Sequence, residues 1–205
     1  MVEHRGAIRA TVWDTLRVVL QSGHQEVGSI RPLQIVDLGG GTGWLAVRVA
    51  ELGHHVTVVD PSPDALASLA RRAAEADVRT AVRGVQGDAV TLRDLVEPGS
   101  ADVVICHGVL EVVDDPVQAL AAAAAVLVEH GHLSVLAAQR SAAVISRALA
   151  GHPIEAHALL DQLDGGPGSA DSVPRRFSRA RLEELVESAG LTVAEVRGVR
   201  VFTDH

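Results

Sequence analysis

"QIVDLGGGTGWLAV", from Gln34 to Val47, is the stretch of sequence that decides the fold. It begins with β-forming residues, continues with the acid Asp37, and then has four glycines among the five residues 39–43. A strand that ends in a glycine-rich turn brings its backbone close to a ligand. The sequence therefore predicts a strand, a ligand-binding turn and a helix, in that order.

Outward from this stretch, apolar runs typical of strands alternate with segments of helical period. The predicted strands cover residues 33–38, 55–60, 82–86, 103–106, 133–137 and 191–202. The predicted helices cover residues 7–21, 44–52, 65–76, 116–128, 142–149 and 178–189. Strands that alternate with helices need crossover connections. We therefore expect an α/β fold with a Rossmann-like, doubly wound, mostly parallel sheet and helices on both faces.

The composition limits the class of protein. The chain has 205 residues, 47% hydrophobic and 21% charged, which suits one domain with its own core. No apolar run approaches the length of a membrane span, so we expect no membrane contact. The single cysteine, Cys106, and a start without a signal-peptide pattern favour a cytoplasmic location. The net charge of −8 argues against a wide nucleic-acid-binding surface, although a local basic patch remains compatible with it.

The glycine turn favours one cofactor over another. A nicotinamide- or flavin-binding turn needs Gly-x-Gly-x-x-Gly, and its last glycine would fall at Trp44. The pattern present is Asp-x-Gly-x-Gly-x-Gly, which resembles motif I of the class I S-adenosylmethionine (SAM)-dependent methyltransferases. This resemblance implies that Asp37 lies near the ammonium group of SAM and that the turn backbone approaches its methionine portion. The glycines concerned are Gly39, Gly40, Gly41 and Gly43.

Three later stretches are similar to further motifs of that family. Asp60 ends a predicted strand where an acid accepts two ribose hydroxyls. Gly87-Asp88-Ala89 follows the next strand, where the family carries an acid that meets the adenine amino group. "ADVVICHGVLEVVDDP", residues 101–116, resembles the strand and segment that line the methyl-transfer site. The resemblance implies cofactor contacts at Asp60, Pro61, Ser62, Asp88, Ala89, Cys106 and His107.

Structural alternatives remain open for several of these residues. Asp60 can cap the helix that begins near Pro61, and Asp88 can be an ordinary turn acid. His107 can be a packing residue at a strand end, and Cys106 a small buried hydrophobe. The ten histidines show no spacing typical of metal ligands, so we expect no metal.

Three islands, "GAIRATVWDTL", "CHGVLEVVDDP" and "GVRVFTDH", look like the bacterial tRNA 5-carboxymethoxyuridine methyltransferases. That family transfers a methyl group from SAM to a carboxylate on the wobble uridine, which gives a methyl ester and S-adenosylhomocysteine. A carboxylate is already a nucleophile near neutral pH and needs alignment rather than a base. Related enzymes that methylate phenols carry a histidine base where this chain has Val112.

The resemblance suggests catalytic roles for His107 and Arg200. An arginine can hold a carboxylate in a two-point grip, and Arg200 is our candidate for the acceptor. Arg9 is a second candidate and can instead hold the carboxylate of SAM. The expected partner is tRNA or a small carboxylate substrate, and the protein is expected to be a monomer or homodimer. Rival hypotheses are a methyltransferase for a small metabolite and a non-catalytic SAM-binding protein.

The expected organisation is one methyltransferase domain over residues 1–205. It comprises an N-terminal helical segment (1–30), a SAM-binding core (31–140), a lid or insertion (141–177) and a C-terminal helix and strand (178–205). The chain departs from the tRNA-modifying family in three respects: its lid has no lysine, position 203 is Thr203 rather than histidine, and it stops at His205. No candidate for the family's last antiparallel strand is present, so we expect that strand to be missing.

Overall fold

The computed structural model describes residues 2–27, 31–161 and 175–199. Its centre is a five-stranded sheet in the order β3-β2-β1-β4-β5, with every neighbouring pair parallel. The predicted Rossmann-like α/β fold is confirmed. The strands are β1 (Gln34–Leu38), β2 (His55–Asp60), β3 (Val82–Gln86), β4 (Ala101–His107) and β5 (Leu127–Leu136).

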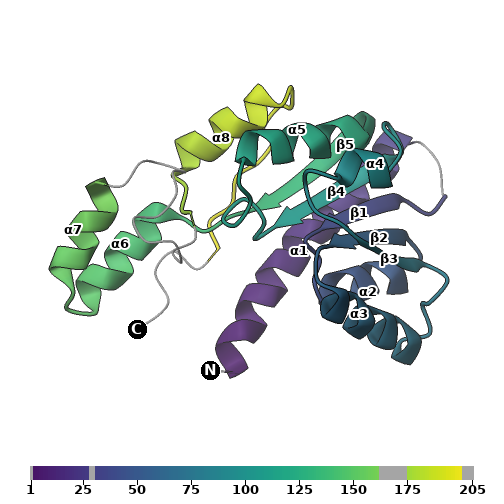
Figure 1. Ribbon diagram of the computed structural model, residues 1–205, viewed down its shortest axis with the longest axis horizontal. Helices are drawn as coiled ribbons and strands as arrows, with labels where there is room; N and C mark the ends of the chain where they lie inside the picture. Colours follow the sequence, from purple (N-terminus) through teal and green to yellow (C-terminus); the bar gives the residue numbers. More distant parts are fainter. Residues whose placement is uncertain (1, 28–30, 162–174, 200–205) are drawn as a thin grey trace.

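Helices cover both faces of the sheet (Figure 1). In chain order they are α1 (Val2–Val27), α2 (Trp44–Glu51), α3 (Pro63–Glu75), α4 (Leu92–Leu95), α5 (Pro116–Val126), α6 (Arg140–Leu149), α7 (Pro153–Asp161) and α8 (Arg179–Ser188). α4, α5 and α8 pack on one face, and α1, α2 and α3 pack on the other. None of the helices in the described ranges is long and apolar enough to cross a membrane.

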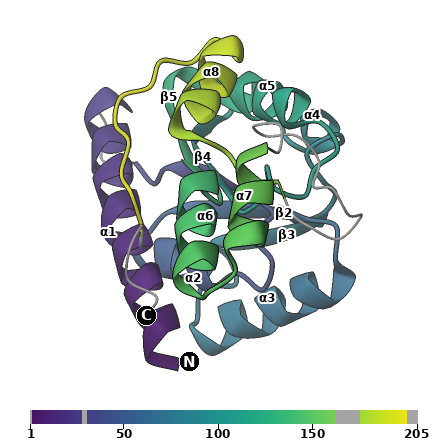
Figure 2. The same cartoon turned by 90° about the vertical axis from the view of Figure 1, so that its left-hand side faces the viewer.

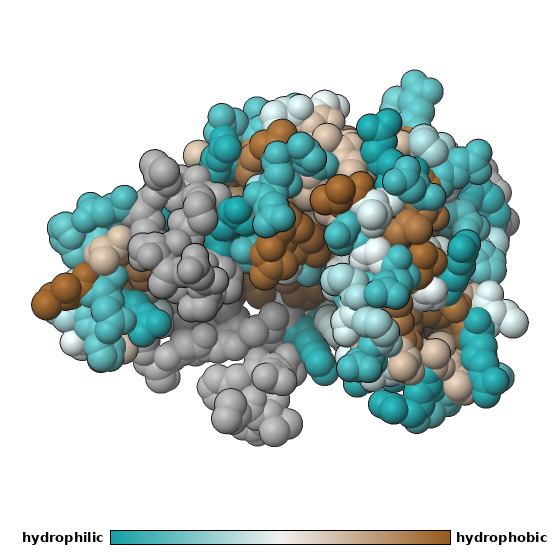
Figure 3. All heavy atoms as spheres, viewed as in Figure 1, coloured by the Kyte–Doolittle hydropathy of each residue, from teal (hydrophilic) through white to brown (hydrophobic). Residues whose placement is uncertain are grey.

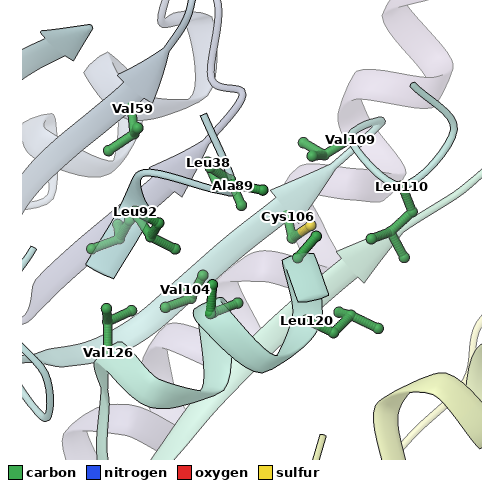
Figure 4. Packing of buried hydrophobic residues seen from close by; sticks show 14 of the residues in the cluster. Leu38, Val59, Ala89, Leu92, Val104, Cys106, Val109, Leu110, Leu120 and Val126 are labelled. Atoms are coloured by element: carbon green, nitrogen blue, oxygen red, sulfur yellow. The ribbon is translucent and has the colours of Figure 1, made fainter. Parts of the chain in front are cut away.

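Adjacent residues of each central strand enter different cores, because side chains alternate across a sheet. In β4, Val104 and Cys106 join the core beneath α5, which Figure 4 shows, whereas Val103 and Ile105 join the core beneath α1 and α2. Both faces are therefore apolar, as a parallel strand buried on both sides requires.

A buried ion pair joins the amino ends of β1 and β4. Asp102, only 2% exposed, accepts two hydrogen bonds from the Arg31 guanidinium at 2.7 and 2.8 Å. It also accepts the backbone N–H of Gln34 at 2.8 Å. These bonds hold the two central strands together at the end opposite the candidate site.

The strand order reverses between β1 and β4, and ligands of open α/β sheets bind at the carboxyl ends of strands at such a point. The α6–α7 pair stands beyond the carboxyl ends of the strands, apart from the helices that cover the two faces of the sheet (Figures 1 and 2). Its two helices pack mainly on each other, with Ala156 and Leu159 buried.

Several predicted boundaries were wrong. β5 begins at Leu127 rather than at residue 133, and α4 and α7 were not predicted. Residues 191–199 were predicted as a strand but have irregular backbone and pair with no strand of the described chain. The rest of that predicted strand, from Arg200 onward, lies outside the described residues.

Candidate active site

The glycine turn after β1 has a backbone that only glycine adopts without strain. Gly39, Gly41 and Gly43 have φ values of 69°, 55° and 74°. The N–H of Gly39 donates to the carbonyl oxygen of Val59 at 2.8 Å, which fastens the turn to β2. The turn therefore has a fixed shape before any ligand binds.

Close packing excludes a side chain at two of these positions. A Cβ atom on Gly40 would lie 2.4 Å from Oδ2 of Asp37, and one on Gly43 would lie 2.0 Å from Cδ1 of Leu69. The first contact brings the backbone over the Asp37 carboxylate, and the second lets α2 pack against α3. The packing of the fold therefore favours glycine at both positions.

Asp37 is a buried acid with an unmet hydrogen-bonding requirement. It is 3% exposed, and its Oδ2 has no hydrogen-bond partner among the described residues. Burial, with a further contribution from the charge of Asp60, raises the pKa of Asp37 to about 7. A buried acceptor without a donor is unfavourable, so this oxygen suits a ligand that brings an ammonium group.

Asp60 connects the glycine turn with the start of α3. Its Oδ2 accepts the N–H of Gly41 and its Oδ1 accepts the N–H of Ser62, each at 2.9 Å. The N-cap of α3 is Ser62, whose Oγ accepts the N–H of Ala65 at 3.2 Å, so the alternative that Asp60 caps this helix is wrong. Pro61 lies exposed between the two residues.

Asp88 shapes the turn after β3. Its Oδ1 accepts the N–H groups of Val90 and Thr91 at 3.0 Å each, together with the Thr91 hydroxyl. These bonds, chiefly the one from the Thr91 backbone, lower the pKa of Asp88. The interpretation of Asp88 as a turn acid is confirmed for this oxygen, and its contact with adenine stays a prediction. The neighbouring Ala89 is buried in the core beneath α5.

Cys106 and His107 are the last two residues of β4, and their side chains differ in their surroundings and in their pKa shifts. The Cys106 thiol is fully buried among apolar side chains (Figure 4), and burial raises its pKa to about 12. Only the backbone of Cys106 is available for a cofactor contact. Burial lowers the pKa of His107 to about 4, so its imidazole is neutral at physiological pH. Nε2 of His107 lies 2.9 Å from Oγ of Ser134 on β5.

Two reciprocal cation–π contacts join α1 to α2. The guanidinium carbon of Arg9 lies 4.9 Å from the ring centroid of Trp44, and that of Arg48 lies 4.2 Å from the ring centroid of Trp13. Trp44 directly follows the glycine turn, so Arg9 is close to the site. Arg200, the other candidate arginine, lies outside the described residues.

Sequence reasoning missed a group of contacts around Glu111. Oε1 of Glu111 accepts the N–H of Ala138 at 2.7 Å, and its carbonyl oxygen accepts the N–H of Arg175 at 3.0 Å. The Arg175 guanidinium binds the carbonyl oxygens of Val113 and Asp114. Oε2 of Glu111 is buried without a partner among the described residues, and burial raises the pKa of this acid. Most of these partners are backbone atoms, which no sequence pattern marks.

Metal binding has no support in the part of the chain that the structure describes, where no cluster of His, Cys, Asp or Glu could hold an ion. The site instead offers a carboxylate without a donor, a turn of exposed backbone and acids at the ends of three adjacent strands. These features suit an organic ligand with an ammonium group and hydroxyl groups.

Comparisons with known proteins agree with this geometry. The family model described as "Methyltransferase domain" matches residues 36–135, from within β1 to the last residue but one of β5. The chain is 30% identical to the tRNA 5-carboxymethoxyuridine methyltransferase of Escherichia coli, over 98% of this chain and 74% of that protein. It is also 30% identical to the ubiquinone biosynthesis O-methyltransferase of Cupriavidus pinatubonensis, over 81% of this chain and 63% of that protein.

Solved structures give the same result. A SAM-dependent methyltransferase of Thermotoga maritima, a possible histamine N-methyltransferase, is 26% identical with a TM-score of 0.51. The similarity covers 83% of this chain and 69% of that one. The chain therefore shares fold and sequence with SAM-dependent enzymes, while it spans only 63% of the length of the Cupriavidus relative.

Proposed function

This chain belongs to the class I SAM-dependent methyltransferases, and on that premise we propose that it methylates a carboxylate. The proposed acceptor is the carboxymethoxy group of wobble 5-carboxymethoxyuridine in tRNA, and the product is a methyl ester. SAM supplies an electrophilic methyl group. The protein has to bind SAM, orient the acceptor oxygen toward that methyl group and exclude competing nucleophiles.

The observation that carries this proposal is that, among the described residues, the end of β4 presents no histidine that is a strong base at neutral pH. Val112, at the position of the histidine base in phenol-methylating relatives, is 69% exposed and apolar. His107 has a pKa of about 4, which makes it a weak base at neutral pH. A phenol or alcohol acceptor must lose a proton, whereas a carboxylate is already ionised. The described site therefore suits a carboxylate better.

In this proposal the cofactor contacts follow the strand ends. Asp37 and the turn of Gly39, Gly40, Gly41 and Gly43 hold the methionine portion of SAM, and Arg9 holds its carboxylate. Asp60, with Pro61 and Ser62, receives the ribose, and Asp88 with Ala89 receives the adenine. The backbone of Cys106 and the side chain of His107 line the methyl-transfer site, and Arg200 orients the acceptor carboxylate.

The proposed organisation keeps one domain over residues 1–205, with the insertion 141–177 acting as a lid. Its helices, α6 and α7, stand beyond the carboxyl ends of β4 and β5 (Figure 1). A tRNA acceptor would place the reaction in the cytoplasm, and we expect a monomer or homodimer.

A second candidate acceptor is a small carboxylate metabolite, and the arginines at the end of the insertion and at the start of α8 favour it. Arg179 pairs with Glu183 and Arg181 pairs with Glu184, each at 2.7 Å. Arg175 binds backbone carbonyls. The two ion pairs of α8 reduce the positive charge that Arg179 and Arg181 can offer to a tRNA backbone, which binds mainly through phosphate contacts.

The decisive experiment uses the purified protein, SAM and tRNA from cells that lack this gene. The tRNA is digested, and the wobble nucleoside is examined by mass spectrometry for one added methyl group. A methyl ester on the carboxymethoxy group is the expected result. If SAM binds in calorimetry but the nucleoside gains no methyl, the tRNA proposal is wrong and a small carboxylate becomes the leading acceptor.

Arg200→Ala tests the proposed acceptor contact, with Arg197→Ala as its matched control. Arg197 is an arginine of the same segment whose Nε already pairs with Glu195 at 2.6 Å. We expect Arg200→Ala to reduce turnover while the affinity for SAM stays unchanged, and Arg197→Ala to behave as the wild type. Unchanged turnover in Arg200→Ala would remove Arg200 from the proposal.

A further inference from the structure

His107 is held from the neighbouring strand by Ser134. The two strands pair in parallel, with Ile105 opposite Ser134 and His107 opposite Leu136. The Ser134 hydroxyl nevertheless reaches the imidazole of His107, with 2.9 Å between Oγ and Nε2. Ser134 is thus a polar side chain in the carboxyl half of β5 that is directed at a residue beside the methyl-transfer site.

The two ring nitrogens of His107 have different surroundings. Nε2 is bonded to Ser134, whereas Nδ1 has no partner among the described residues. Nε2 is thus occupied by Ser134, and Nδ1 is the ring nitrogen left for a further hydrogen bond.

The single N–H proton of the neutral His107 ring can lie on either nitrogen, which gives two possible tautomers. A neutral imidazole carries one N–H, and the nitrogen without it accepts a hydrogen bond. A serine hydroxyl can serve either state, because it can donate to Nε2 or accept from it. The direction of the Ser134 bond consequently decides whether Nδ1 acts as a donor or as an acceptor.

We propose that Ser134 is a positioning residue whose hydroxyl donates to Nε2 of His107, so that the imidazole presents Nδ1–H to the methyl acceptor. The direction rests on the proposed function, because a carboxylate acceptor requires a donor. A neutral N–H orients a carboxylate oxygen without adding a positive charge beside a sulfonium.

The first test reads the tautomer directly and needs no substrate. Nitrogen-15 NMR of the full-length protein distinguishes Nδ1–H from Nε2–H imidazoles, and the spectrum of His107→Gln identifies the signals of His107. We expect an Nδ1–H tautomer in the wild type and in Ser134→Thr. Ser134→Ala should shift His107 toward Nε2–H, the form that histidine favours in water.

Ser100→Ala is the matched control, because the Ser100 hydroxyl binds the carbonyl oxygen of Glu97 at the opposite end of β4. It should leave the His107 tautomer unchanged. An Nε2–H tautomer in the wild type, or an unchanged tautomer in Ser134→Ala, would overturn the proposal.

The second test measures methylation of tRNA and binding of SAM. Ser134→Ala should raise KM for the acceptor or lower kcat by up to about tenfold, as expected for one hydrogen bond, with SAM affinity unchanged and with rescue by Ser134→Thr. A shifted tautomer with unchanged kinetics would overturn the role in acceptor binding. A shifted tautomer in a protein whose wild type does not methylate tRNA would contradict the proposed function and still support the contact between Ser134 and His107.

Discussion

The carboxylate of Asp60 accepts the backbone N–H of Gly41 at 2.9 Å, although 19 residues separate them in the chain. Through this bond an acid at the end of β2 fixes the turn at the end of β1. Its second oxygen binds Ser62 at the start of α3. The acid expected to meet the ribose therefore also holds the turn expected to meet the methionine portion, so one substitution affects both contacts.

Asp60→Ala should weaken SAM binding by about 1–3 kcal/mol, because hydrogen bonds to a charged acceptor are lost on both the turn and the cofactor. Isothermal titration calorimetry measures the change. Asp64→Ala is the control, since Asp64 is an exposed acid in the first turn of α3. Equal affinities for SAM in the two variants would show that Asp60 does not contact the cofactor.

Gly43→Ala and Gly53→Ala separate backbone strain from steric overlap. Both glycines have positive φ, 74° and 91°, so each alanine should lose about 1 kcal/mol of stability. Only Gly43→Ala also overlaps Leu69, which should add about 1–3 kcal/mol. Chemical denaturation gives the two free energies of unfolding. If the two variants lose the same stability, the close approach of α2 to α3 is not rigid.

Asp37 should make the free protein less stable as pH rises. Its folded pKa of about 7 exceeds the unfolded value of 3.8, so the native state binds more protons than the unfolded state between these values. The stabilisation is complete below pH 4 and is lost as pH rises through 7. Asp37→Asn should remove this contribution, so the free energy of unfolding of the variant should change with pH more positively than that of the wild type between pH 5 and 7, as denaturant titrations can measure. The partly buried His107, whose pKa is lowered, contributes in the opposite sense to Asp37. An equal pH slope in wild type and variant would contradict the assigned pKa.

Asp102→Asn should destabilise the fold by about 1.5–3 kcal/mol, the range for lost hydrogen bonds to a charged group, because the remaining charge on Arg31 is 43% exposed and stays hydrated. Glu75→Gln is the control, since Glu75 and its partner Arg71 are both largely exposed and 3.9 Å apart. Thermal and urea unfolding should show a clear loss for the first variant and almost none for the second. Similar losses would mean that the Asp102 contacts add little to the pairing of β1 with β4.

Local pattern was sufficient for two of the strands. β2 and β3 have the bounds that were predicted: the apolar run of β2 ends at Asp60, and β3 ends just before Gly87. The start of β5 was missed because the sequence Glu129-His130-Gly131-His132 interrupts its apolar run, and His130 has a φ of 64°. Pairing with β4, which matches Ala101 to Leu127, creates that part of the strand and is not visible locally.

The candidate site likewise contains some residues that the sequence predicted and others that it did not. Asp37, Asp60 and the glycines follow a spacing that sequence alone carries, and the structure brings them together at one edge of the sheet. Glu111, Ser134 and Arg175 could not be found in this way. Their partners are the N–H of Ala138, one ring nitrogen of His107 and the carbonyl oxygen of Asp114, which come together only when the strands pair.

The reciprocal contacts between α1 and α2 also involve the two residues that give this protein its intrinsic fluorescence. The chain has two tryptophans and no tyrosine, so its near-ultraviolet emission comes almost entirely from Trp13 and Trp44. Each indole ring lies beneath a guanidinium group from the facing helix. Trp44 also directly follows the glycine turn. The intrinsic fluorescence therefore reports on the junction between the N-terminal helix and this turn. A ligand that reorders the turn should change the spectrum without an attached dye.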